Sequence, residues 1–126
     1  MYKKMLLALL LCSLLTVLLA ACAIRDAAAG AGPTVHMNGT DFVQKSVTIH
    51  KGDMLTLVDD AASTHIVVNG SWVNGSQVPK IEPGAPTVNA QYNGNDSSPI
   101  GPFNTAGTFH VYCTIHQNMN LTITVQ

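Results

Sequence analysis

Short apolar runs that alternate with polar residues, and that are separated by turn-forming residues, fill the chain from Pro33 to its C-terminus. Alternation with a period of two residues is typical of half-buried β-strands, and no segment beyond residue 32 has a convincing helical period. The pattern therefore predicts an all-β fold, a β-sandwich of about seven to eight strands. The segments expected to form strands are 34–37, 46–50, 54–58, 65–68, 88–92, 108–113 and 121–125.

Turn signals interrupt these runs. Asn69-Gly70 and Asn74-Gly75 are dipeptides typical of hairpin turns, and they flank Trp72, the single tryptophan. The segment 79–102 is dense in Pro, Gly, Asn and Ser, so we expect mostly loop there apart from the short strand at 88–92.

The N-terminal part of the chain differs in composition from the rest. Residues 1–4 end in two lysines, and residues 5–21 are almost entirely apolar. This arrangement is typical of a secretory signal, and the length of the apolar run is at the short limit for a membrane span. Cys22 follows Leu-Ala-Ala, which resembles a bacterial lipobox. The resemblance implies a lipoprotein signal peptide at 1–21 and lipidation of Cys22; the alternative is an ordinary signal peptide with a chance cysteine. Residues 22–32, rich in Ala and Gly, are expected to form a flexible tether before a domain at 33–126.

Cysteine usage and charge narrow the function classes further. Of the three cysteines, Cys12 lies in the leader and Cys22 would carry lipid, which leaves Cys113 as an unpaired thiol in an exported chain. No disulfide framework is therefore expected. From Cys22 onward the net charge is −3, and the absence of a basic stripe argues against a nucleic-acid partner. The basic residues there are Arg25, Lys45, Lys51 and Lys80, against seven acidic residues.

The segment 108–120 carries a thiol, an imidazole and a thioether in the spacing C-x2-H-x2-M, namely Cys113, His116 and Met119. A lone cysteine or methionine is more often a core residue. The combination, however, offers two soft sulfur donors beside an imidazole, a set that favours copper over hard cations. A blue-copper centre needs a second histidine in its trigonal plane, with the methionine as the weak axial ligand.

Strand alternation restricts the choice of that second histidine. If Cys113 points inward, Phe109 and Val111 do so too, whereas His110 and Tyr112 face outward.

The remaining histidines differ in their settings. His36 and His50 are expected to face solvent, because their neighbours form the apolar face of each strand. His65 instead sits where a polar loop enters an apolar strand. We predict His65 as the second histidine ligand, with His50 and His36 as the alternatives.

The run Gly107-Thr-Phe-His-Val-Tyr-Cys-Thr-Ile-His-Gln-Asn-Met119 resembles the ligand loop of the cupredoxins, the plastocyanin and amicyanin group. In that group a G-T-[YF]-x-[FV]-Y-C-[ST]-x-H run ends one strand and opens the copper loop, and the two-residue gap before Met119 is similar to amicyanin. The resemblance covers roughly residues 34–126 but is specific only in this loop and around His65. It implies a cupredoxin-like Greek-key β-sandwich that binds one type 1 (blue) copper per chain through His65, Cys113, His116 and Met119.

Three positions depart from the pattern of that group. Ile66 stands where many cupredoxins have Asn, so a side-chain tie to Thr114 is absent. Phe109 replaces a common corner Tyr, and Gln117 replaces the Pro that often follows the second histidine. None of these changes removes a ligand, but each bears on the rigidity and the potential of the site.

The function that the resemblance implies is single-electron transport between membrane-associated redox partners, without enzyme activity. A donor and an acceptor would dock near His116, where Ile115, Gln117 and Asn118 carry no charge. The protein would be a monomer, anchored through Cys22 at the outer face of the cell membrane or in the periplasm. A copper storage or delivery module is the first alternative. An enzyme such as a copper reductase or oxidase domain ranks below it, because the chain has no His-x-His pair and a single Cys in the loop.

Overall fold

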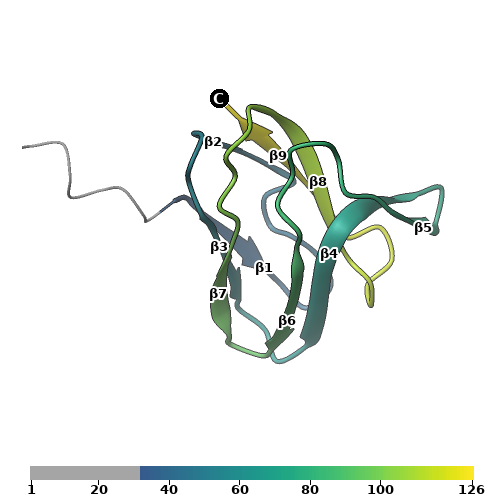
Figure 1. Cartoon of the computed structure of the whole chain (residues 1–126). Helices are drawn as coiled ribbons and strands as arrows, with labels where there is room; N and C mark the ends of the chain where they lie inside the picture. The colour runs from purple at the N-terminus through teal and green to yellow at the C-terminus, as the bar shows by residue number, and fades with distance from the viewer. Residues whose placement is uncertain (1–31) are drawn as a thin grey trace, which may run out of the picture.

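The computed structural model describes residues 32–126, which form an all-β sandwich of two mixed sheets (Figure 1). The fold class is thus confirmed, with nine strands instead of seven to eight. No helix in this part of the chain is long and apolar enough to cross a membrane. The predicted signal peptide (1–21), Cys22 and nearly all of the predicted tether (22–32) lie outside the described residues.

The smaller sheet has three strands and the larger one six. The smaller sheet has the order β1-β3-β7, formed by β1 (Thr34–Met37), β3 (Leu55–Asp59) and β7 (Ser97–Ile100). The larger sheet has the order β2-β9-β8-β4-β5, with β6 also paired to β4. Its strands are β2 (Ser46–Ile49), β4 (Thr64–Val73), β5 (Ser76–Pro79), β6 (Asn89–Asn93), β8 (Gly107–Cys113) and β9 (Asn120–Val125). The pairs β1–β3 and β2–β9 are parallel, and the remaining pairs are antiparallel.

One hydrophobic core lies between the sheets and follows the sequence alternation. In β8, Phe109, Val111 and Cys113 are buried, as the alternation predicted. In the facing sheet, Leu55 and Leu57 of β3 are buried in the same way. Burial of apolar surface on both inner faces is the main stabilising contribution in such a sandwich, and it gives the site a rigid frame.

The two Asn-Gly dipeptides behave differently. Asn74 and Gly75 have φ angles of 51° and 77° and connect β4 to β5, so this hairpin is confirmed. Asn69-Gly70 is not a turn, because β4 runs through it to Val73. The buried Asn69 side chain is instead used to hold the following segment: its Nδ2 donates to the Pro86 carbonyl (3.0 Å) and its Oδ1 accepts from the Val88 N–H (2.6 Å).

Candidate metal centre

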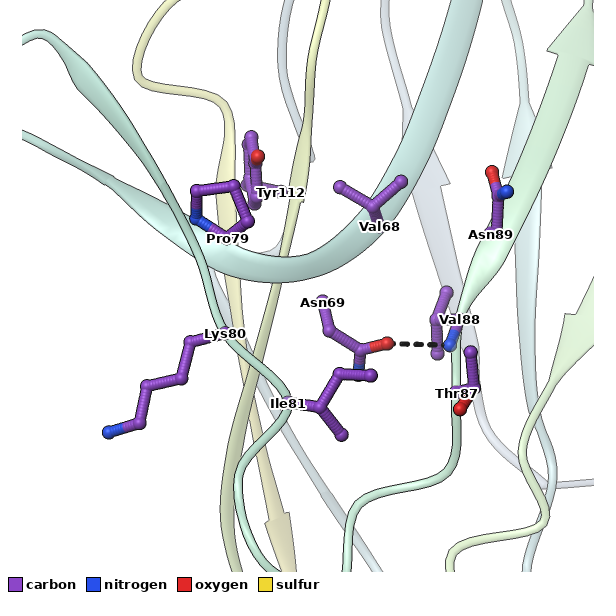
Figure 2. A pocket seen from close by; sticks show the side chains of 9 residues that line it. All are labelled: Val68, Asn69, Pro79, Lys80, Ile81, Thr87, Val88, Asn89 and Tyr112. Carbon is purple, nitrogen blue, oxygen red and sulfur yellow. Dashed lines mark hydrogen bonds between the residues drawn. The ribbon is translucent and has the colours of Figure 1, made fainter.

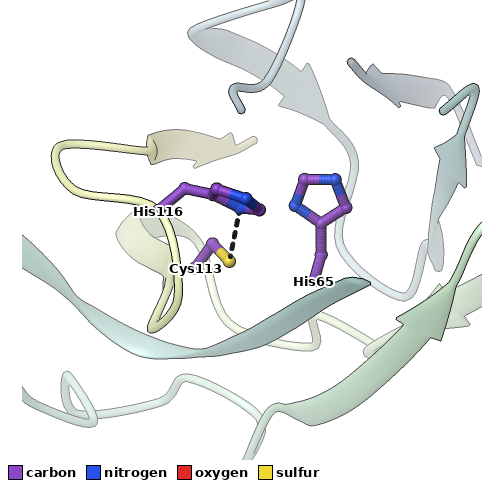
Figure 3. A group of neighbouring side chains, drawn as sticks. All are labelled: His65, Cys113 and His116. Carbon is purple, nitrogen blue, oxygen red and sulfur yellow. Dashed lines mark hydrogen bonds between the residues drawn. The ribbon is translucent and has the colours of Figure 1, made fainter. Parts of the chain in front are cut away.

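His65, Cys113 and His116 come together at one end of the sandwich, where their ligand atoms all lie within 4.8 Å of one another (Figure 3). The strand register explains the meeting. Val67 of β4 pairs with Cys113, the last residue of β8. His65 lies two residues earlier on the same face of β4 and therefore projects just beyond the end of β8, where the loop that carries His116 begins.

The His65 ring is completely buried, and only one of its two nitrogens, Nε2, lies near polar side chains. Its Nε2 lies 3.3 Å from Ser63 Oγ and 3.6 Å from Asp59 Oδ1. Its Nδ1 is buried and has no hydrogen-bond partner among the described residues. Because buried polar atoms are normally paired, this nitrogen is the one that is free to act as a ligand.

The charge state of His65 also suits a ligand. Burial lowers the pKa of His65 below its usual value, and the nearby His116 acts in the same direction. The Asp59 carboxylate and the Asn38 backbone oppose this shift of the pKa, but burial is the largest effect. The neutral imidazole, which has a lone pair to donate, is therefore the favoured form.

Asp59 is a residue of the site that the sequence interpretation missed, because the strand predicted at 54–58 ended one residue before it. Its carboxylate is buried: Oδ1 accepts from the Ala61 N–H (3.0 Å) and Oδ2 from the Gly94 N–H (3.2 Å). The signal was present, since Asp59 continues the inward alternation of Leu55 and Leu57. A buried acidic residue needs polar partners, and besides these N–H groups the Asp59 carboxylate lies 3.6 Å from His65 Nε2.

The ligand loop, residues 113–119, is closed by its own backbone. The Cys113 N–H donates to the Met119 carbonyl (3.0 Å), and the Met119 N–H donates to the His116 carbonyl (3.2 Å). Asn118 adopts a φ of 63°, a left-handed conformation that Asn tolerates better than most residues. Met119 is completely buried in this closed loop.

Within the loop the imidazole of His116 faces both other donors. Its Nδ1 lies 3.6 Å from Cys113 Sγ, and its ring centroid lies 4.7 Å from that of His65 with the planes at 52°. His116 itself is half-buried. The site thus has an inner part, formed by His65 and Cys113, and one imidazole that reaches toward the surface.

The other histidines stay away from this group. His36 pairs with Asp60 (2.8 Å) and His110 with Glu82 (2.8 Å), both at partly exposed positions. The side chain of His50 is 85% exposed. The structure therefore brings neither of the alternative ligands, His36 and His50, to the site.

Tyr112 faces away from the core, as the strand alternation predicted. It lies on the outer face of the sheet, but it is only 1% exposed. The Trp72 ring meets it edge-on at a centroid distance of 6.1 Å, and Gln77 Oε1 accepts from its hydroxyl (3.3 Å). Burial raises the pKa of Tyr112. Tyr112 is thus an outward-facing residue that Trp72 and Gln77 cover.

Tyr112 also lines an open pocket of about 430 Å³ on this outer face, together with Val68, Asn69 and Pro79 (Figure 2). None of the residues His65, Cys113, His116 and Met119 lines it. The pocket is thus separate from the metal centre, which lies on the other face of the sheet.

No protein-family description matches this sequence, and no curated protein does. Solved structures do match. A purple cupredoxin from Nitrosopumilus maritimus superposes with a TM-score of 0.58 at 17% identity, over 75% of this chain and 99% of its own. An amicyanin from Paracoccus versutus superposes with a TM-score of 0.57 at 20% identity, over 85% of this chain and 88% of its own. The chain has the cupredoxin fold.

A third structure places the same fold inside a larger protein. The copper-containing nitrite reductase of Thermus scotoductus superposes with a TM-score of 0.57 at 21% identity, over 76% of this chain but only 22% of its own. At such identities the likeness to the three proteins concerns the fold, and the chemistry has to be argued from the site itself.

The residues at the site fit a copper ion. A thiol and two imidazoles converge, one imidazole nitrogen is buried without a partner, and a buried methionine lies in the same loop. These donors are softer than those that magnesium or calcium prefer. The donor chemistry therefore points to copper.

Proposed function

We propose that this protein is a type 1 copper electron-transfer protein that carries single electrons between redox partners. The observation that carries the proposal is the convergence of His65, Cys113 and His116 within 4.8 Å at the end of a rigid sandwich. Met119, whose thioether is a weak donor, would complete the set. When bound at these residues, one copper per chain would supply one-electron redox chemistry.

The protein's part in this chemistry is to keep its donors still. His65 is fixed by strand β4 and by the Ser63 and Asp59 contacts at its Nε2. Cys113 and Met119 are buried and joined through a backbone hydrogen bond. Donors that are held in one arrangement need little movement between the two oxidation states, which keeps the barrier to electron gain and loss low.

The surface near His116 supports docking of a partner without strong charge steering. Ile115 is 49% exposed, and Gln117 and Asn118 are exposed as well. A donor and an acceptor would approach this uncharged face, where the half-buried His116 imidazole lies nearest to solvent. Association of this kind depends little on ionic strength.

A visible spectrum of the copper-loaded protein tests the proposal. We expect an intense charge-transfer band from the copper–thiolate bond, and one copper per chain. Cys113→Ser should leave a pale Cu(II) site or none, whereas His50→Ala, which removes an exposed histidine outside the group, should keep the full band. A wild-type protein that takes up zinc but stays colourless with Cu(II) would contradict the proposal.

Storage or delivery of copper without redox turnover is the second candidate, since the same donors would hold the metal in either role. Enzyme activity is not part of the proposal. A catalytic metal needs an open coordination position, and the four donors at this site would fill the coordination of a copper ion.

We also propose that the protein is exported and tethered to a membrane through lipid on Cys22, at the outer face of the cell membrane or in the periplasm. The Leu-Ala-Ala-Cys sequence after an apolar run supports this. Several acyl chains would hold the domain firmly, because each buried CH2 contributes about 0.8 kcal/mol. Cys22→Ser should move the protein from the membrane fraction to a soluble or unprocessed form. Soluble wild-type protein with a free Cys22 thiol would contradict the tether.

A further inference from the structure

The hairpin formed by the end of β4 and by β5 projects from the sandwich beside the ligand loop (Figure 1). We define it as residues 70–79. Gly70, at its base, has a φ of 120°, and a Cβ there would collide with the backbone of the returning strand at Val78 and Pro79. Every residue of β5 is exposed, so burial of β5 in the core does not explain why the hairpin is ordered.

Trp72 joins the hairpin to both ends of the ligand loop. At the start of the loop, the indole Nε1–H donates to the Cys113 carbonyl (2.8 Å). At its end, the Asn120 side chain bonds the Trp72 backbone twice: Oδ1 accepts from the N–H (2.7 Å) and Nδ2 donates to the carbonyl (3.1 Å). One residue of β4 therefore contacts both Cys113 and Asn120, with its ring packed on Tyr112 at the outer face of the sheet.

Two glutamine side chains add hydrogen bonds between the hairpin and the ligand loop. Gln77 Nε2 donates to the Thr114 carbonyl (3.1 Å), and Gln117 Nε2 donates to the carbonyl of Gly75 in the hairpin turn (3.3 Å). One of the two glutamines lies in the hairpin and the other in the loop, so the segments hold each other in both directions. All of these bonds join residues at least 37 positions apart in the sequence.

We propose that this hairpin braces the ligand loop, with Trp72 as the positioning residue that fixes the orientation of Cys113. The Cys113 carbonyl is bonded to the indole while its N–H is bonded to Met119, so both backbone groups of the residue are held. A fixed backbone fixes the direction of the Cys113 Cα–Cβ bond, from which Sγ reaches to 3.6 Å from His116 Nδ1. The role of the brace in copper binding rests on the proposed function, whereas its effect on the loop does not.

Hydrogen exchange in the copper-free, full-length protein tests the brace without the metal. Trp72→Phe keeps an aromatic ring against Tyr112 but removes the indole donor. Loss of such a bond should speed exchange of the loop amides at 114–119 by roughly tenfold, with no change in the sheet β1-β3-β7. Unchanged loop exchange would overturn the proposal, and so would an equal acceleration in that remote sheet, because it would mark a general loss of stability.

A matched pair of glutamine variants provides a second test and replaces the first if Trp72→Phe does not fold. Gln77→Met removes the donor to Thr114 at an exposed position, together with the acceptor for the Tyr112 hydroxyl. Gln91→Met removes an exposed bond to Asn93 on β6, which lies on the other side of β4 from β8. We expect faster loop exchange for Gln77→Met and wild-type exchange for Gln91→Met. Equal behaviour of the two variants would contradict the brace.

The copper-loaded protein gives the readout that bears on Cys113 itself. In Trp72→Phe we expect unchanged copper stoichiometry, roughly tenfold faster copper release, and a broader copper–thiolate band, because the thiolate samples more than one orientation. A band of unchanged width would limit Trp72 to a stabilising role and overturn its role as a positioning residue. If the wild-type protein binds no copper while loop exchange responds as expected, the proposed function fails and the brace stands.

Discussion

Met119 is completely buried, and its backbone bonds both Cys113 and His116. Met119→Leu nearly conserves volume, so we expect less than about 1.5 kcal/mol of destabilisation. The copper–thiolate band should remain, because the thiolate and both imidazoles are kept. The potential should rise, since loss of a weak donor destabilises Cu(II) more than Cu(I). We expect a rise on the order of 59 mV, which is tenfold in a one-electron equilibrium.

Voltammetry and copper titration of Met119→Leu measure these effects, with Met37→Leu as a control for a buried methionine in strand β1. The control should change neither the band nor the potential. Complete loss of copper binding by Met119→Leu alone would mean that the thioether is a principal ligand and that our assignment of an axial role is wrong.

Ionisation of Tyr92 should lower the stability of the folded protein at alkaline pH. Burial raises the pKa of Tyr92 to about 12 from a usual value of 10.0, although the bond from its hydroxyl to the Ser98 carbonyl opposes the shift. The unfolded chain therefore loses this proton first. Stability should fall as pH rises from 10 toward 12, by roughly 2 to 3 kcal/mol at about 1.36 kcal/mol per pH unit.

Tyr92→Phe removes this dependence, and urea unfolding of the copper-free protein at several pH values measures it. Near pH 8 the variant should be weaker than the wild type by no more than about 1 kcal/mol, the contribution of one hydrogen bond. Above pH 10 its stability should decline less steeply than that of the wild type. Parallel declines would show that Tyr92 ionises in the folded state as easily as in the unfolded state.

At the scale of elements, the strands that the sequence predicted are those with one buried face. Strand β8 alternates Phe109, Val111 and Cys113 inward, so its pattern directly reflects the core. Strands β5 and β7 were missed for the opposite reason. All of β5 is exposed. Strand β7 carries Pro99 at the edge of its sheet, where no further strand needs the N–H that proline lacks. Neither strand has the apolar period that identifies a half-buried strand.

The same distinction applies to the site. Cys113, His116 and Met119 could be predicted because their spacing is local, and His65 could be chosen because a polar loop meets an apolar strand there. The partners of these residues could not. Trp72 contacts the loop across 41 and 48 positions of sequence, distances at which only the strand pairing determines which side chains meet. Sequence spacing thus predicts the candidate metal ligands, whereas the residues that position these ligands become apparent only from the strand pairing.

At the scale of the whole molecule, the surface proposed for partner docking around His116 is formed by segments without charged residues. The described residues include Lys45, Lys51 and Lys80 and six acidic residues, yet neither the hairpin (70–79) nor the segment 113–120 contains any of them. The hairpin thus extends the uncharged surface around His116. A carrier that uses this face should meet its partners, and other copies of itself, at rates that vary little with salt.

Repeated redox cycling separates a carrier from a copper store. For a carrier we expect the copper–thiolate band to return in full after each cycle of reduction and reoxidation beside a Cu(I) chelator, because the buried Cys113 and Met119 keep hold of the metal in both states. Electron self-exchange between two copies of the protein is the second measurement, and for a carrier it should be fast and nearly independent of salt. Ile115→Lys places like charges on both partners and should slow self-exchange at low ionic strength, with recovery as salt is added. Val43→Lys, another exposed apolar position, is the control and should have little effect. Loss of the band after one cycle, with no response to Ile115→Lys, would identify the protein as a copper reservoir.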